Sequence, residues 1–205
     1  MHTERVSYDV ITPSAARGIL EAVYWKPAIR WVIDEIAVLN PIVFETIRRN
    51  EVGSKASYQN AKKVMRSGTG TLGIDAAADR QQRNTLYLKD VDYVVRAHFE
   101  LVPERCGVDD TVEKHYNIAL RRLRKGQCFN QPYLGCREFP ACVDYLEGDC
   151  EAPDSCFKDS GERDLGFMLY DMDFSRPKDI HPEFFRAIMH DGVIDVAKAR
   201  EGMVS

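Results

Sequence analysis

Residues 110–126 read DTVEKHYNIALRRLRKG, and this stretch predicts an amphipathic helix with one basic face. Asp110 is expected to cap the helix, with Glu113 three residues later completing a capping box, and Gly126 supplies a stop signal. The side chains that recur at helical spacing are Val112, Tyr116, Ala119, Leu120 and Leu123. This helix lies between strand-like segments, which is a first indication of a mixed α+β fold.

Lys114 and His115 fall in the first turn of the expected helix. Unpaired backbone N–H groups and the helix dipole favour an anion there, so a cation is misplaced by about 0.3–1 kcal/mol unless a negative group meets it. Arg121, Arg124 and Lys125 follow seven, ten and eleven residues after Lys114 and extend one basic stripe. The stripe indicates a phosphate-binding surface, although basic helix faces are often only solvated.

The composition is that of an ordinary globular protein, with 44% hydrophobic and 29% charged residues in 205. A chain of this length can bury one good core, with room for a smaller appendage. We expect no signal peptide, because no apolar run follows the first residues. No stretch approaches the ~18 consecutive apolar residues of a membrane span, so a cytoplasmic protein without membrane contact is expected.

The formal net charge of −4 argues at first against a nucleic-acid partner. The acidic residues are concentrated, however: Asp144 to Asp164 holds eight acidic and two basic residues, which leaves the rest of the chain at +2. Basic clusters occur at 48–49, 62–66 and 121–125. Because local patches set the field that a polyanion meets, a nucleic-acid partner stays open.

The six cysteines form no C-x-x-C pair, and typical zinc-ligand spacings are absent. We expect free thiols in a reducing compartment, no metal site and no cofactor. A zinc-dependent nucleic-acid module is kept as a minor alternative. The cysteines are Cys106, Cys128, Cys136, Cys142, Cys150 and Cys156.

Pattern along the chain favours an antiparallel α+β protein. A helix is expected to begin at Thr12-Pro13, with threonine as the cap and proline at the first helical position. Residues 51–82 contain few large apolar side chains and are expected to form a long mobile loop, whose basic residues could clamp a nucleic-acid strand. The expected strands are 28–39, 84–88, 91–102, 133–139, 165–174 and 193–196, and a short helix is expected at 182–190.

Short motifs distributed along nearly the whole chain carry a family resemblance. They include Tyr24-Trp25-Lys26-Pro27, Lys114-His115-Tyr116, Lys125-Gly126-Gln127-Cys128 and the run from Tyr133 to Glu138. With these motifs in this order, the sequence resembles the CRISPR-associated Cas-five family in its Dvulg (type I-C) form.

The resemblance implies a ferredoxin-like (RRM-like) domain over residues 1–127 and a small antiparallel β-rich domain over 128–205. The family normally begins with an aromatic-rich strand ahead of the part that matches Glu4 onward. This N-terminal strand is therefore expected to be missing here, which would affect the sheet and the activity.

The resemblance also implies an endoribonuclease that cuts precursor CRISPR RNA at the base of the repeat hairpin. Such a protein then holds the 5′ handle as a subunit of the type I-C interference complex. A non-catalytic subunit that binds the crRNA handle is the alternative, and DNA binding is left open.

Carried over from the family, the catalytic residues are Tyr24, Lys114 and His115. In a metal-independent cut, the 2′-hydroxyl attacks the phosphorus and leaves a 2′,3′-cyclic phosphate. His115, with a reference pKa near 6.5, suits proton transfer, and Lys114 suits the developing negative charge. Whether His115 or Tyr24 is the general base stays open. The residues expected to bind RNA are Lys26, Arg48, Arg49, Arg121, Arg124, Lys125 and Arg137.

Overall fold

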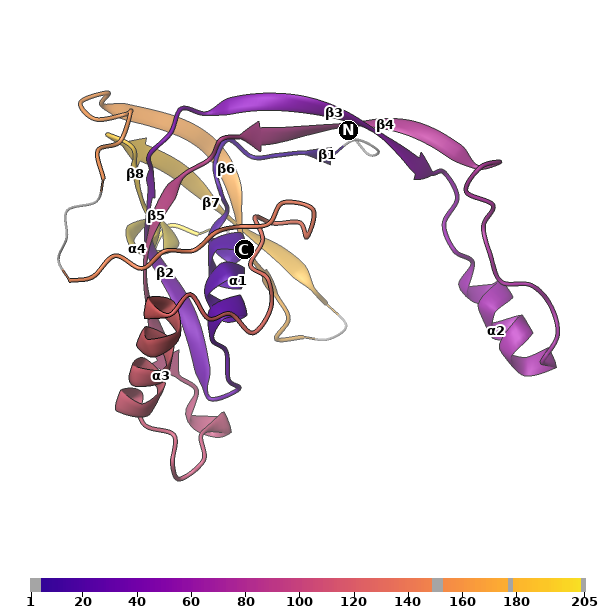
Figure 1. The fold of residues 1–205 in the computed structure, drawn as a ribbon, viewed down its shortest axis with the longest axis horizontal. Coiled ribbons are helices and arrows are strands. Elements are labelled where there is room, and N and C mark those ends of the chain that lie inside the picture. The colour runs from indigo at the N-terminus through magenta and orange to yellow at the C-terminus, as the bar shows by residue number, and fades with distance from the viewer. Residues whose placement is uncertain (1–4, 149–152, 177–178, 204–205) are drawn as a thin grey trace. The chain divides into compact units, whose positions relative to one another are not determined.

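Helices and strands are mixed along the chain, as expected for an α+β protein (Figure 1). The computed structural model describes residues 5–148, 153–176 and 179–203. The strands are β1 (Arg5–Val6), β2 (Ile29–Val38), β3 (Val43–Val52), β4 (Arg80–Lys89), β5 (Tyr93–Leu101), β6 (Glu162–Asp173), β7 (His181–His190) and β8 (Val193–Asp195). The helices are α1 (Pro13–Val23), α2 (Tyr58–Ser67), α3 (Val112–Arg124) and α4 (Val196–Arg200), with a 3-10 turn at Pro103–Arg105.

The chain divides into two compact units. The first comprises Met1–Ser7 and Val43–Lys89, and the second comprises Tyr8–Ile42 and Asp90–Ser205. The first unit is therefore largely an insertion between β2 and β5 of the second. The expected division at residue 127 is a different one and stays a prediction.

The second unit is built on a five-stranded antiparallel sheet in the order β5-β2-β8-β7-β6. Most of β2 is buried, because it lies between two strands and is contacted by both α1 and α4. Thr12 caps α1 by accepting the backbone N–H of Ala15 at 3.2 Å, and Pro13 occupies the first turn. The helix start expected at Thr12-Pro13 is confirmed.

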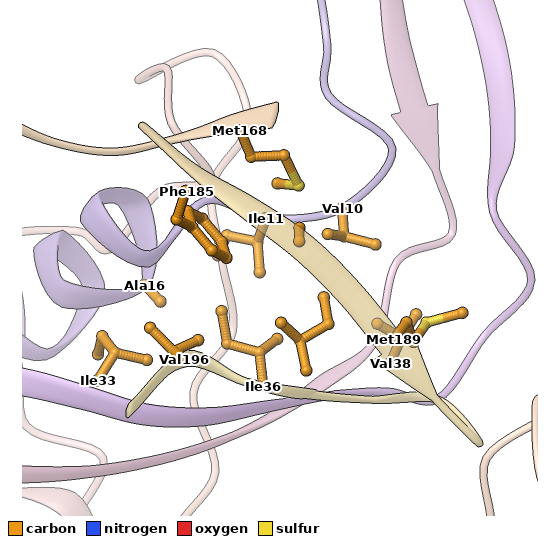
Figure 2. Packing of buried hydrophobic residues seen from close by; sticks show 12 residues of the cluster. Val10, Ile11, Ala16, Ile33, Ile36, Val38, Met168, Phe185, Met189 and Val196 are labelled. Carbon is orange, nitrogen blue, oxygen red and sulfur yellow. The ribbon is translucent and has the colours of Figure 1, made fainter. Parts of the chain in front are cut away.

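The main core of this unit packs side chains of α1 and the segment before it against β2, β6, β7, β8 and α4 (Figure 2). Full burial of a Val, Leu, Ile, Phe or Met side chain stabilises a fold by about 1.5–3 kcal/mol. The buried members are Val10, Ile11, Ala16, Ile33, Ile36, Val38, Met168, Phe185, Ala187, Met189, Ile194 and Val196.

A smaller cluster joins the end of α1, the start of β2 and α3. Val23, Tyr24, Ile29, Trp31 and Ala119 are its buried members. It fixes α3 against the end of α1, and so determines which side chains of these two helices meet.

The first unit is a three-stranded sheet in the order β1-β4-β3, in which β3 and β4 form a long hairpin with α2 in the connection (Figure 1). Among its described residues only Thr85 is buried. Residues 43–89 contain nine basic and four acidic side chains. This unit is thus polar, exposed and positively charged.

The segment 51–82, expected to be one long mobile loop, contains helix α2 and the paired ends of β3 and β4, while its mobility stays a prediction. Register pairing from Val43↔Lys89 to Val52↔Arg80 extends both strands into that segment. Ser57 caps α2 by accepting the N–H of Asn60, and Gly68 ends the helix with φ of 64°. The polar composition of this segment is that of exposed strand ends, an exposed helix and the connections between them.

Two further expectations for the second half of the chain are wrong. Residues 182–190 belong to strand β7 and not to a helix, because Phe185, Ala187 and Met189 alternate into the core with a period of two. The strand expected at 133–139 is reduced to a single bridge between Tyr133 and Pro140, and Gly135 turns the chain with φ of 76°.

Most of the expected strands are confirmed. Strands expected at 28–39, 91–102, 165–174 and 193–196 are confirmed as β2, β5, β6 and β8, and the strand at 84–88 is the second half of β4.

The cap of α3 is Thr111 and not Asp110, because the Thr111 hydroxyl accepts the N–H of Lys114 at 3.2 Å. Cys150 and the residues before Arg5 lie outside the described residues, so the expectation about the N-terminal strand stays a prediction.

None of the helices in the described parts of the chain is long and apolar enough to cross a membrane.

Candidate active site

Tyr24 follows directly after α1 and is held by hydrogen bonds to both of its backbone polar groups. Its backbone N–H bonds the carbonyl of Leu20 at 2.9 Å, and its own carbonyl accepts the indole N–H of Trp31 at 2.8 Å. The residue has an extended backbone and is only 1% exposed. The phenol therefore points from the end of a helix into the small core cluster.

His115 lies on the buried face of α3, four residues before Ala119. Its Nδ1 is 2.7 Å from the hydroxyl oxygen of Tyr24, across 91 residues of sequence. The rings of Phe99 and His115 form a T-shaped pair, with 6.4 Å between ring centroids and 77° between the ring planes. The structure thus brings the expected phenol and imidazole into direct hydrogen-bond contact.

Asp110 supplies the negative group that meets the cation at the start of α3. One carboxylate oxygen, Oδ1, lies 3.1 Å from Nζ of Lys114 and 3.2 Å from Nε2 of His115. The second contact is close, but it lies off the line that a hydrogen bond needs. Within the described residues, Nε2 is thus buried without a hydrogen-bond partner.

Two pKa shifts describe the electrostatics of this cluster. The N–H of Gly107 and the ammonium of Lys114 hold the pKa of Asp110 below its usual value, so its carboxyl is ionised at neutral pH. Burial raises the pKa of Tyr24, against the opposing effect of Lys114 and Arg122. The phenol therefore keeps its proton at neutral pH unless a neighbouring base accepts it.

Arg122 is a site residue that the sequence reasoning missed. Its guanidinium carbon lies 5.3 Å from the ring centroid of Tyr24, and Nη1 donates to the carbonyl of Val23 at 2.8 Å. Position 122 is seven residues after His115, which is two helical turns and hence the same face of α3. This seven-residue spacing could have identified Arg122 from the sequence. Asp110 was noticed only as an expected cap.

The three candidate catalytic side chains differ in their access to solvent. Tyr24 and His115 are each 1% exposed, whereas the side chain of Lys114 is 43% exposed. The ring of Tyr24 has Arg122 beside its face, and the ring of His115 has Phe99 against it. An RNA can thus reach Lys114 in this arrangement, while access to the phenol requires some of these side chains to move.

The residues expected to bind RNA divide between the two units. Lys26, Arg121 and Lys125 are exposed in the second unit, and so is Arg137. Arg124 is exposed too, but it forms an ion pair with Glu147, with Nε 2.6 Å from Oε1. Arg48 and Arg49 lie on β3 of the first unit. Within the second unit the structure therefore gathers Tyr24, Lys114 and His115.

In the described segments, no group of three or more His, Cys, Asp and Glu side chains has the arrangement of a metal site. Cys106 is half-buried, and its Sγ lies 3.2 Å from the carbonyl oxygen of Val102. The other described cysteines are exposed free thiols: Cys128, Cys136, Cys142 and Cys156.

The fold is similar to that of a CRISPR-associated protein. A solved structure described as a CRISPR-associated protein matches with a TM-score of 0.68 and 26% identity, over 96% of this chain and 84% of its own. A functionally uncharacterized protein from Streptococcus mutans matches with a TM-score of 0.65 and 27% identity, over 92% and 80% of the two chains.

More narrowly, the chain belongs to the Cas5d family, because the family model described as CRISPR-associated protein (Cas_Cas5) matches residues 1–197. A relative from Mannheimia succiniciproducens, named CRISPR pre-crRNA endoribonuclease Cas5d, is 50% identical over 96% of this chain and 87% of its own length. A protein of the same name from Thermus thermophilus is 43% identical over 83% of this chain and 65% of its own. The resemblance to the type I-C family expected from the sequence motifs is confirmed.

Proposed function

We propose that this chain is an endoribonuclease that cuts precursor CRISPR RNA, the activity for which its two curated relatives are named. The observation that carries the proposal is the 2.7 Å contact between the Tyr24 hydroxyl and Nδ1 of His115. An acid–base pair next to the exposed ammonium of Lys114 supplies the groups that cleavage by a 2′-hydroxyl needs.

The pKa of Tyr24 is raised by burial, which makes a free tyrosinate unfavourable as the base. In the proposed step the 2′-hydroxyl proton passes to the Tyr24 oxygen while the phenolic proton passes to Nδ1 of His115. The 2′-oxygen forms a bond to phosphorus, the bond from phosphorus to the 5′-oxygen breaks, and that oxygen takes a proton from solvent. Lys114 stabilises the negative charge that develops on the phosphoryl oxygens.

This mechanism needs no metal ion, so cleavage of repeat RNA is expected to persist in excess EDTA. The 5′ fragment should end in a 2′,3′-cyclic phosphate, identified by mass spectrometry. A substrate with 2′-deoxyribose at the scissile nucleotide is the control and should stay intact, because it lacks the attacking group. Loss of cleavage in EDTA that added Mg²⁺ or Zn²⁺ restores would contradict the mechanism and favour a metal-dependent module.

A second candidate function is a non-catalytic subunit that binds the crRNA handle. It is favoured by the burial of Tyr24 and His115, since the closed arrangement exposes only Lys114 of the three. Purified wild-type protein that binds repeat RNA but leaves it intact would select this alternative. In either case we propose that the chain holds the 5′ handle within a type I-C interference complex.

The basic stripe on α3 is proposed to contact RNA phosphates. For Arg121→Ala we expect weaker binding and a salt dependence flatter by about 0.7–0.9 in the slope of log K against log salt concentration, the value for one lost phosphate contact. Arg124→Ala should change binding less, because Arg124 already pairs with Glu147. Filter binding at several salt concentrations measures both effects.

Arg163→Ala in β6 is the control for this series and should leave the slope unchanged, since Arg163 lies in the acidic part of the sequence. An Arg121 variant with the wild-type slope would mean that this side chain faces away from the RNA. Lys26, Arg137 and the positively charged first unit with Arg48 and Arg49 are proposed as further RNA contacts.

The ferredoxin-like architecture is also a proposal. It is supported by the order α1-β2-β5-α3, which is the αββα centre of a βαββαβ domain once Val43–Lys89 is taken as an insertion.

A further inference from the structure

Asp110 is held in place by a short turn before α3. The backbone N–H of Gly107 donates to Oδ2 of Asp110 at 2.9 Å, and the N–H of Asp110 donates to the carbonyl of Gly107 at 3.1 Å. The next residue, Thr111, caps the helix that carries Lys114 and His115. The carboxylate thus has one oxygen anchored by the turn, and its direction is set by backbone contacts.

The other oxygen faces both candidate catalytic side chains of α3. Oδ1 lies 3.1 Å from Nζ of Lys114 and 3.2 Å from Nε2 of His115. An ionised carboxylate has no hydrogen to give and can only accept. A hydrogen bond between Oδ1 and the imidazole therefore requires that Nε2 carries the proton. Nε2 is buried without a hydrogen-bond partner among the described residues, so Oδ1, 3.2 Å away, is the acceptor nearest to hand for its proton.

The opposite side of the ring is ambiguous by itself. Nδ1 of His115 and the Tyr24 oxygen are 2.7 Å apart, and either atom could be the donor. A neutral imidazole carries one proton, so a proton on Nε2 leaves Nδ1 with a free lone pair. The Tyr24 hydroxyl must then be the donor.

We propose that Asp110 is a positioning residue that keeps His115 in the Nε2–H tautomer, so that Nδ1 can accept the proton of Tyr24. This inference rests on the proposed function. The contact between Nε2 and Oδ1 is poorly aligned here, as catalytic hydrogen bonds often are before substrate binds, and a small rotation of the ring or carboxylate closes it. The same carboxylate stabilises the imidazolium that forms after proton transfer, as in other carboxylate–histidine pairs.

The alternative tautomer would block the proposed chemistry. With the proton on Nδ1, the imidazole would donate to the Tyr24 oxygen and could no longer accept from it. The path from the 2′-hydroxyl through Tyr24 to His115 would then have no acceptor at its end.

The test is Asp110→Asn, which preserves the shape of the side chain but replaces one acceptor oxygen with an NH₂ donor. An amide nitrogen facing Nε2 favours the tautomer with the proton on Nδ1. We expect ¹⁵N NMR of the full chain to show His115 protonated on Nε2 in the wild type and on Nδ1 in the variant. Single-turnover cleavage should fall about 10²–10⁴-fold, the range between loss of an orienting partner and loss of the correct tautomer, without weaker RNA binding.

Two variants complete the experiment. Asp109→Asn removes the same charge one residue away, from an exposed side chain, and should leave both the tautomer and the rate unchanged. Asp110→Glu retains a carboxylate and should retain the Nε2–H tautomer and more activity than the asparagine variant. It also provides a second readout if Asp110→Asn folds poorly.

An asparagine variant with the wild-type tautomer, or one that changes tautomer and still cleaves at the wild-type rate, would overturn the role of Asp110. The NMR measurement needs no RNA, so it separates this proposal from the proposed function. A wild-type chain that leaves repeat RNA intact would contradict the endoribonuclease proposal. The His115 tautomers of the wild type and of Asp110→Asn would still decide whether Asp110 orients His115.

Discussion

His115→Ala is expected to lower the single-turnover rate of repeat RNA cleavage about 10²–10⁴-fold, the usual contribution of general acid–base catalysis. Among the described residues, the imidazole is the side chain to which the Tyr24 hydroxyl is hydrogen-bonded, at 2.7 Å. Alanine therefore removes the proton acceptor proposed for the phenol. RNA binding should be retained, because the exposed lysine and the basic stripe are unchanged.

The replacement also removes a buried side chain, so its effect on stability has to be measured beside the rate. Thermal unfolding and the RNA dissociation constant show whether the variant is folded and competent to bind. His98→Ala is the matched control, since His98 is exposed and bonds Asp34 at 2.8 Å away from the buried pair. A folded His115→Ala protein with the wild-type cleavage rate would remove His115 from the mechanism.

Tyr24→Phe is expected to give the second large effect, a loss of about 10²-fold or more in the cleavage rate. The substitution deletes one oxygen atom and preserves the ring, so the contact with Arg122 and the backbone bond to Trp31 are retained. What is lost is the group that faces both the imidazole and, in the proposed complex, the 2′-hydroxyl. The buried Nδ1 of His115 is left without a partner, which should lower the free energy of unfolding by about 1–3 kcal/mol.

Tyr116→Phe is the control for this change, because Tyr116 is the next residue after His115 and is exposed. It should affect neither the rate nor the stability. If Tyr24 and His115 act as one unit, the double variant should be little slower than the worse single variant. Rate losses that multiply in the double variant would show that the two side chains act independently.

Much of the architecture was readable from local pattern. The capped start at Thr12-Pro13, the amphipathic helix from Val112 and the strand-like segments at 28–39 and 165–174 all have strong signals within a few residues. Such signals come from helix caps, apolar periodicity and turn residues, which act over one or two turns of chain. The family motifs around Tyr24 and Lys114-His115 likewise indicated the Cas5 family and the three candidate catalytic residues, whose roles stay predictions.

Pairing over long distances could not be seen in this way. Strands β3 and β4 hydrogen-bond along an exposed polar hairpin, so their ends at 51–52 and 80–82 lack the apolar alternation that predicts a strand. A helix was expected at 182–190 although Phe185, Ala187 and Met189 alternate, and the pairing of β7 with β6 and β8 shows that the segment is a strand.

Sequence thus defined the α+β class, the family and the types of side chain available for RNA cleavage, because these depend on residue identity and short-range spacing. Tertiary packing alone brought the phenol of Tyr24 to the imidazole of His115, and it turned Asp110 from an expected helix cap into the group that faces His115 and Lys114. The reason is physical: the small core cluster, formed by residues far apart in the chain, sets how α3 lies against the end of α1. A chain segment does not encode the distance to a partner that it meets only after folding.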